Sequence, residues 1–174
     1  LPLTLLGLHV ATVQPAGAYT NYRQWLGSLS GSADDASKWT PGGIPDPGTF
    51  ADFVAAGTYT VTFPATVSAT SVIGFSAGNV TTQFLSPHTT GNLFVSNTAT
   101  CNTGVLNTDW MHVGEGGFTG TLTLTRQTPV GSSAEWHSKA AFHSPVSGDM
   151  VGRTAAGTLN VFGGAQFYSG AAGM

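Results

Sequence analysis

The feature that most constrains the fold is a series of short runs in which apolar and polar residues alternate. In Thr58–Phe63 the side chains of Tyr59, Val61 and Phe63 fall on one face, and threonines fall on the other. Strict alternation is typical of a β-strand with one buried face. Similar short runs lie at 71–75, 80–85, 92–95, 110–113, 121–125, 158–162 and 166–168. No segment after residue 18 sustains a helical period, so the sequence predicts an all-β protein.

Two of these runs belong to a repeated pattern. Residues 113–124 and 151–161 both read Val-Gly, a short turn of small residues, and then Gly-Thr-Leu-x-aliphatic. The final unit begins at Gly120 in one copy and at Gly157 in the other, and a degenerate earlier copy begins at Gly91. Loops inserted between strands explain the unequal spacing, and the longest insertion is expected at 126–147. We expect Gly120 and Gly157 to occupy tight corners with positive φ.

The repeat favours stacked coils over isolated hairpins. A strand of about five residues buries only two or three side chains, each worth roughly 1.5–3 kcal/mol, so one hairpin is not stable alone. Stacking would place Leu122 over Leu159 and Leu124 over Val161 at a spacing of about 4.8 Å. We therefore predict a right-handed, single-stranded parallel β-helix (a β-solenoid). The alternative is an antiparallel β-sandwich, which Asn-Gly or Asp-Gly turns would favour, and neither dipeptide occurs.

The first 50 residues differ from this pattern. Residues 1–13 are apolar but too short to span a bilayer, and Pro15 and the small residues at 16–18 follow them. This order predicts a partial signal peptide at 1–18, with its own first residues missing, and hence a secreted protein without a transmembrane segment. The alternative is a buried N-terminal strand. Residues 19–50 are rich in Gly and Pro and are expected to cap β-solenoid coils that occupy 51–174 and are truncated at the C-terminus. The large apolar residues of this region are expected to pack as a lid over the core: Trp25, Trp39, Ile44 and Phe50.

Charge and cysteine content exclude several classes of protein. Asp, Glu, Lys and Arg make up 7% of the chain, with a net charge of −3, whereas ordinary soluble domains carry about 25%. Five Lys and Arg residues are too few to neutralise a row of phosphates, so nucleic acid is not an expected partner. Like charges in stacked columns would repel one another, which explains their scarcity. Cys101 is the single cysteine and is expected to be a small buried filler.

Residues 151–165 read VGRTAAGTLNVFGGA. This pattern resembles the repeats of bacterial autotransporter-type and PEP-CTERM-associated surface proteins. The copy at Gly120 departs from it, because Thr125-Arg126-Gln127 stands where the later copy has Phe162-Gly163-Gly164. The resemblance implies a parallel β-helix on the outer surface of a bacterium, with a structural and adhesive role and no catalysis. Its partners would be surface glycans or other surface proteins.

Two groups of residues are candidate sites. Coils in register could bring together Asp109, Glu115 and Asp149 at one edge, as a calcium site or as catalytic carboxylates. The expected insertion concentrates residues that could form a platform contacting sugars or proteins: Trp136, His137, Lys139 and His143. No other cofactor is expected. Because parallel β-helices also include polysaccharide lyases and glycosidases, a carbohydrate-active enzyme is the alternative function.

Overall fold

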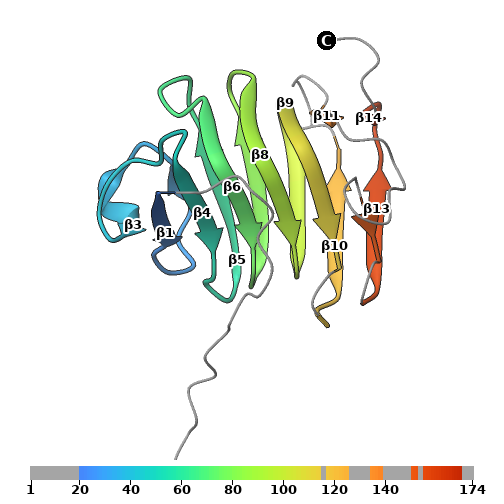
Figure 1. The fold of residues 1–174 in the computed structure, drawn as a ribbon, viewed down its shortest axis with the longest axis horizontal. Helices are drawn as coiled ribbons and strands as arrows, with labels where there is room; N and C mark the ends of the chain where they lie inside the picture. The colour runs from blue at the N-terminus through green and yellow to red at the C-terminus, as the bar shows by residue number, and fades with distance from the viewer. Residues whose placement is uncertain (1–19, 115–116, 126–133, 139–149, 153–154, 170–174) are drawn as a thin grey trace, which may run out of the picture.

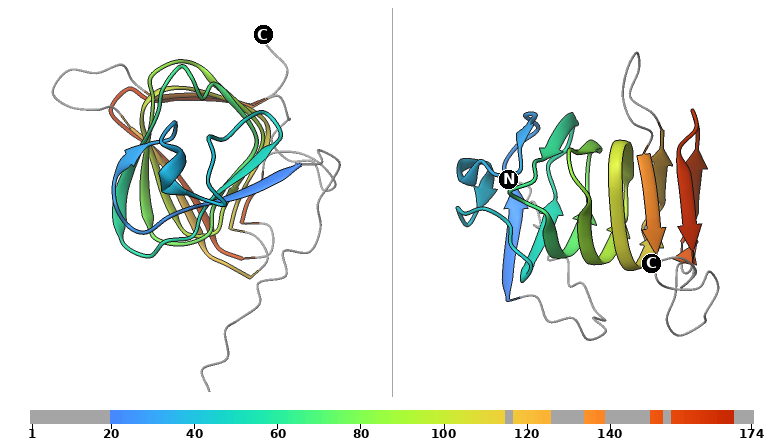
Figure 2. Two further views of the ribbon diagram at one scale, coloured as in Figure 1. Left: turned by 90° about the vertical axis from the view of Figure 1, so that its left-hand side faces the viewer. Right: turned by 90° about the horizontal axis from the view of Figure 1, so that it is seen from above.

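The fold was obtained as a computed structural model, which describes residues 20–114, 117–125, 134–138, 150–152 and 155–169. The chain winds around one axis, and successive turns stack side by side as coils (Figures 1 and 2). Strands of neighbouring coils pair in parallel, and among the described strands only β1 and β3 pair antiparallel. The predicted parallel β-helix is therefore confirmed and the sandwich alternative is wrong. The predicted signal peptide at 1–18 lies outside the described residues.

The described residues form fourteen strands and one short 3-10 helix, η1 (Ala36–Lys38). The strands are β1 (Asn21–Trp25), β2 (Gly31–Ser32), β3 (Trp39–Thr40), β4 (Thr49–Phe53), β5 (Thr58–Phe63), β6 (Ala69–Phe75), β7 (Asn79–Phe84), β8 (His88–Val95), β9 (Thr98–Val113), β10 (Gly120–Leu124), β11 (Ala134–Ser138), β12 (Met150–Val151), β13 (Gly157–Val161) and β14 (Gln166–Ser169). Each run predicted to be a strand coincides with one of these strands or lies within it, to within one or two residues.

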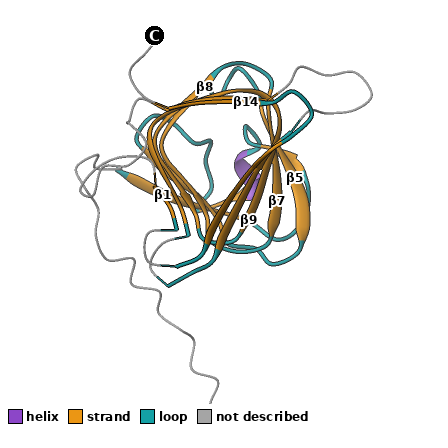
Figure 3. Cartoon of the chain, turned by 90° about the vertical axis from the view of Figure 1, so that its right-hand side faces the viewer, coloured by secondary structure: helices purple, strands orange, loops and turns teal. Residues whose placement is uncertain are grey.

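Two sheets form the wall of the solenoid. One, which we call sheet B, contains β2, β5, β7, the first part of β9, β10 and β13. The other, sheet A, contains β3, β1, β4, β6, β8, the second part of β9, β11, β12 and β14. Figure 3 shows them as different sides of one ring. β9 belongs to both sheets and turns at Gly104, where φ is +87° and a Cβ atom would lie 1.9 Å from the Phe84 carbonyl oxygen.

The register of the coils confirms one part of the predicted repeat and corrects another. Leu122 pairs with Leu159 and Leu124 with Val161, as predicted. Gly91, however, lies in β8 of sheet A, whereas Gly120 and Gly157 begin strands of sheet B. The unit at Gly91 is therefore not an earlier copy. In the preceding coil the strand that pairs with β10 is β9. There Ala99, which is chemically unlike leucine, lies opposite Leu122.

Gly120 and Gly157 do not have positive φ, contrary to our expectation; the left-handed residues are the glycines of the Val-Gly corners, Gly114 and Gly152, each at φ +78°. Close approach of neighbouring backbone explains the other two glycines. A Cβ atom would lie 2.0 Å from the Val95 carbonyl oxygen at Gly120 and 2.1 Å from the corresponding oxygen of Val113 at Gly157. Each position therefore needs glycine for space.

The interior is a single apolar cluster that is closed at the N-terminal end. Trp25 and Trp39 are each 1% exposed, and their rings meet edge to face at 5.0 Å between centroids. Both also contact Phe53 in the first full coil. Two of the four expected lid residues thus cover the core. Ile44 is 45% exposed instead, and Phe50 meets Tyr22 on the outside of sheet A.

One buried histidine interrupts the apolar interior. His88 packs against the rings of Phe63 and Phe84, which also contact each other, and its Nδ1 lies 2.9 Å from the Val67 carbonyl oxygen. Its Nε2 lies 3.2 Å from the Thr70 hydroxyl. Burial lowers the pKa of His88 to about 4, because the charged form would lose its hydration. The residue is therefore a neutral part of the core at ordinary pH.

Candidate functional site

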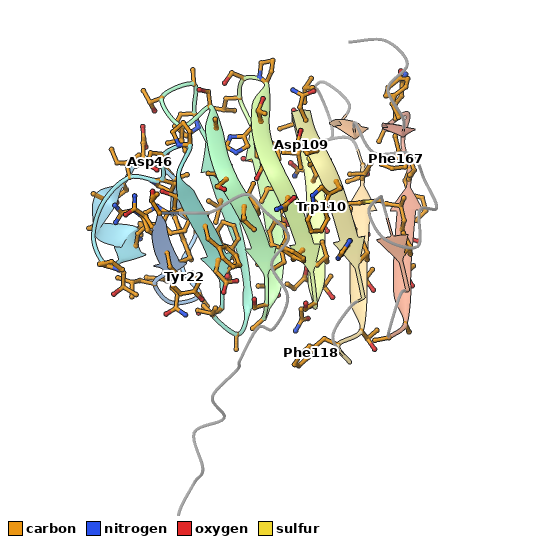
Figure 4. All side chains as sticks on the ribbon, viewed as in Figure 1. Tyr22, Asp46, Asp109, Trp110, Phe118 and Phe167 are labelled. Carbon is orange, nitrogen blue, oxygen red and sulfur yellow. The ribbon has the colours of Figure 1, made fainter. Side chains whose placement is uncertain are left out.

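The outer surface of sheet A carries two adjacent columns of mainly aromatic and polar residues. Each column consists of residues that pair with one another from strand to strand. Residues between these columns, such as Ala51, Leu93 and Met111, point into the core, so alternation directs the columns outward. Figure 4 shows Tyr22 and Trp110 over this face. We define the outer-face patch by the two columns. One contains Tyr22, Phe50, Val72, Asn92 and Trp110, and the other contains Gln24, Asp52, Gly74, Phe94 and His112.

Three rings form the aromatic end of the patch. Phe94 meets Trp110 edge to face at 5.5 Å between centroids and meets His112 at 5.6 Å. The rings of Trp110 and His112 are 4.4 Å apart and inclined by 47°. Phe94 and Trp110 remain partly exposed, whereas His112 is buried. Such a cluster offers apolar ring surface on rigid strands, with the polar edge of Trp110 beside it.

A hydrogen-bonded carboxylate forms the polar end. Asp52 is 5% exposed and accepts hydrogen bonds from the Tyr22 hydroxyl at 2.6 Å and from the Ser76 hydroxyl at 2.7 Å. The Gln24 amide donates to the Tyr22 oxygen at 2.9 Å. Burial raises the pKa of Asp52 above its ordinary value, although both hydroxyl donors act in the opposite direction.

Gly74 makes room for the polar end. A Cβ atom there would lie 2.6 Å from the Phe50 ring and 2.9 Å from the Asp52 carboxylate. The glycine near the end of β6 therefore leaves space for the ring and the carboxylate over the strand. A side chain at this position would displace one of them.

The two ends of the patch are too far apart to act as one reacting centre. Asp52 and His112 occupy the same column, three strand spacings apart, which corresponds to about 14 Å. They cannot share a proton or coordinate one ion. The patch is instead an extended row of aromatic and polar side chains along the sheet.

The predicted acidic cluster is described only in part. Asp109 is exposed in β9, and its Oδ2 lies 3.8 Å from an ideal Cβ at Gly91 of the neighbouring strand β8. Glu115 and Asp149 lie outside the described residues. Within the described ranges, no three His, Cys, Asp or Glu residues are placed to hold a metal ion. The calcium site therefore remains a prediction.

The predicted contact platform includes a strand. Trp136 and His137 lie in β11, not in a loop as predicted, and pair with Leu106 and Asn107 of β9. Lys139 and His143 lie outside the described residues. Ser138 pairs with Thr108, and Met150 pairs with His112, so residues 139–149 stand where β9 has only 109–111. Leu124 pairs with Cys101 and Ala134 with Gly104, so residues 125–133 likewise stand where β9 has only 102–103. The expected long insertion at 126–147 is therefore divided in two by β11.

Sequence reasoning did not identify the outer-face patch. Phe94 lies in the run Leu93-Phe94-Val95, where a continuous apolar stretch hides the alternation. The missing information is the register, because the columns join residues about twenty positions apart.

The fold defines the chain as a parallel β-solenoid. Comparison with family models, with curated proteins and with solved structures gave no match. In the part of the chain described by the structure, no helix has the length and apolar character needed to cross a membrane.

Proposed function

We propose that the chain is a structural and adhesive segment of an exported bacterial surface protein of the autotransporter or PEP-CTERM-associated repeat type. In this proposal residues 1–18 direct secretion, and the solenoid is a stiff rod on the outer cell surface. The outer-face patch supports the adhesive role, because its side chains stand on hydrogen-bonded strands and need little ordering when a ligand binds. Weak contacts of this kind add up when a surface carries many rods.

The chemistry of the patch favours a neutral surface glycan as its ligand. The rings of Phe94 and Trp110 offer flat apolar surface to the C–H faces of sugar rings. The exposed Tyr22 and the half-buried Gln24 supply hydrogen-bonding groups along the same face. The chain has only five Lys and Arg residues to attract an acidic polymer. Another surface protein is the second kind of partner.

One observation favours the alternative, a polysaccharide-degrading enzyme. The raised pKa of Asp52 is a property expected of a general acid, and Tyr22 is hydrogen-bonded to it. Hydrolysis of a glycoside usually needs a second carboxyl group within roughly 10 Å. Glu115 and Asp149 lie outside the described residues, so activity must be tested directly.

Binding and cleavage can be measured in one experiment. The purified chain is incubated with insoluble neutral and acidic polysaccharides, and both bound protein and released reducing ends are measured. We expect binding to a neutral polymer, weakened about tenfold in Trp110→Ala, which corresponds to loss of a contact residue worth more than 1 kcal/mol. Phe118→Ala is the matched control, because Phe118 is 47% exposed at a site away from the patch (Figure 4). Equal loss in both variants would contradict the proposal.

Asp52→Asn separates the two functions. An adhesive patch should keep most of its affinity, because the amide oxygen can accept from the Tyr22 hydroxyl while the amide NH2 group donates to the Ser76 oxygen, in place of the two bonds to the carboxylate. An enzyme should lose turnover while it still binds. Release of reducing ends by the unaltered chain, abolished in Asp52→Asn, would establish the enzymatic alternative.

The calcium and loop proposals need separate tests. If Asp109, Glu115 and Asp149 bind calcium, a chelator should lower the melting temperature of the unaltered chain and leave Glu115→Ala unaffected. If Trp136, His137, Lys139 and His143 form the contact platform, Lys139→Ala and His143→Ala should weaken polysaccharide binding more than Trp110→Ala does.

A further inference from the structure

The outer face of sheet B carries a regular array of threonines. Its outward residues form two columns along β5, β7, β9, β10 and β13, because these strands pair in parallel and in continuous register at the positions concerned. Figure 3 shows β5, β7 and β9 together on one side of the ring. Eight of the ten positions are threonine, and we call the set the threonine array. One column contains Thr58, Asn79, Thr98, Thr121 and Thr158, and the other contains Thr60, Thr81, Thr100, Thr123 and Asn160.

The side chains of the threonine array point outward. Every residue of the array is at least partly exposed, whereas residues that alternate with them, such as Val61, Val80 and Leu122, are buried in the core. Thr81 and Thr100 lie opposite each other near the centre of the array. Within the described residues, their hydroxyl groups have no hydrogen-bond partner. The array therefore presents hydroxyl and methyl groups to the surroundings of the protein.

The face that carries the threonine array is electrically neutral. The strands β5, β7, β10 and β13 and the first part of β9, at 98–103, contain no Asp, Glu, Lys, Arg or His. The strands of sheet A, in contrast, contain Arg23, Asp52 and Asp109. Charges across an interface are complementary, so a neutral face fits a neutral ligand. A hydroxyl group both donates and accepts hydrogen bonds, which suits a ligand whose own groups do both.

The threonine array repeats in two directions. Equivalent threonines on neighbouring strands are about 4.8 Å apart, and the two columns are separated by two residues, which is about 6.6 Å along each strand. Because threonine is β-branched and stiff at χ1, the side chains keep the spacing of the backbone. A ligand that fits every position of the array must itself repeat in two dimensions. Such a repeat is a property of a crystal surface and not of a single flexible chain.

We infer that the threonine array binds the surface of ice crystals. Ice is neutral, and the oxygen atoms on its prism face repeat at two lengths similar to those of the array. A threonine hydroxyl donates and accepts hydrogen bonds as a lattice water does, and its methyl group fits the hollow between rows of oxygen atoms. The array contains no aromatic ring of the kind that packs on sugar rings, which favours ice over a crystalline polysaccharide.

The test measures thermal hysteresis, which is the interval between the temperatures at which an ice crystal melts and grows, in solutions of the full chain. The unaltered chain should show a thermal hysteresis that rises with protein concentration. Thr81→Lys should abolish it, because a charged and hydrated side chain then stands near the centre of the array. Thr89→Lys is the matched control and should keep it, since Thr89 is an exposed threonine on β8 of sheet A. Circular dichroism should show the same fold for all three proteins.

Two further variants sharpen the test. Asn79→Thr should raise the thermal hysteresis, because it adds a threonine in register with two others of its column. Trp110→Ala should leave it unchanged, because Trp110 lies on sheet A. The inference is overturned if the unaltered chain shows no thermal hysteresis, if Thr81→Lys and Thr89→Lys lose it equally, or if Asn79→Thr fails to raise it. Binding to microcrystalline cellulose or chitin that Thr81→Lys abolishes, without thermal hysteresis, would assign the array to a polysaccharide and overturn the inference too.

Discussion

The two ends of the described solenoid differ in how well their core residues are covered. At the N-terminal end the chain adds an antiparallel pair, β1 with β3, and two tryptophans that are each 1% exposed. At the C-terminal end Val161 is 42% exposed, although its column partner Leu124 is fully buried. A parallel coil therefore does not close itself. Closure requires bulky side chains from a segment that leaves the repeat.

The largest effect is expected from opening the closed end. Trp39→Ala should reduce the free energy of unfolding by about 3–5 kcal/mol, because it leaves a cavity beside Trp25 and Phe53 and removes the hydrogen bond to the Ala33 oxygen. Denaturant unfolding followed by tryptophan fluorescence measures the change. Trp39→Phe keeps most of the ring and should lose clearly less. An unchanged denaturation midpoint in Trp39→Ala would show that Trp39 does not contribute to covering the core.

A second pair of substitutions compares two paired residues, Leu124 and Val161, that differ in burial. Leu124→Ala should cost about 2–5 kcal/mol because the side chain is fully buried. Val161→Ala, in the same column on the last coil, should cost less than about 1 kcal/mol, since half of its surface already contacts water. Equal losses in denaturant unfolding would mean that the last coil is covered in solution.

Acid should weaken the half of the solenoid near the closed end. The pKa of His88 is about 4 in the folded chain and about 6.5 when unfolded, so the unfolded state binds the proton first. Its contribution is complete above pH 6.5 and is lost as the pH falls towards 4, by up to about 3 kcal/mol. His88→Gln should flatten the stability profile over that interval. A profile of equal slope in both proteins would contradict the assignment.

The smallest effect is expected where the predicted lid proved wrong. Ile44→Ser should change the free energy of unfolding by less than about 0.5 kcal/mol, because Ile44 is 45% exposed and lies outside the core cluster. Thermal melting of this variant beside Trp39→Ala separates the residues that close the end from those that only lie near it. A loss of stability comparable to that of Trp39→Ala would show that Ile44 also covers the core.

The strands that could be predicted are those with strong alternation. Thr58–Phe63 places Tyr59, Val61 and Phe63 inward, as the pattern indicates. The first part of β9 was missed because its inward residues are small or polar: Ala99, Cys101 and Thr103. In a stacked coil a small residue can fill a column position, since the residues above and below it supply the contacts. The hydrophobicity of a short sequence window does not include those contacts with neighbouring coils.

In the candidate site, too, local sequence predicts some residues and only the stacking of coils reveals others. Trp136 and His137 were singled out because they lie close together in the sequence, whereas Asp52, Phe94 and Trp110 come from three different coils. Their alignment depends on how many residues each turn contains. That number varies from coil to coil: Tyr59 pairs with Val80, 21 positions further on, whereas Leu122 pairs with Leu159, 37 positions further on.

The amino-acid sequence by itself determined the all-β character, the parallel stacking and the pairing of Leu122 with Leu159. These depend on local alternation and on similar residues recurring in order. Only the tertiary structure decided that Gly120 and Gly157 make room for backbone oxygens, that one face gathers an aromatic and polar patch, and that Trp25 and Trp39 close the N-terminal end. These properties arise between coils, where side chains far apart in sequence meet at the spacing of a strand.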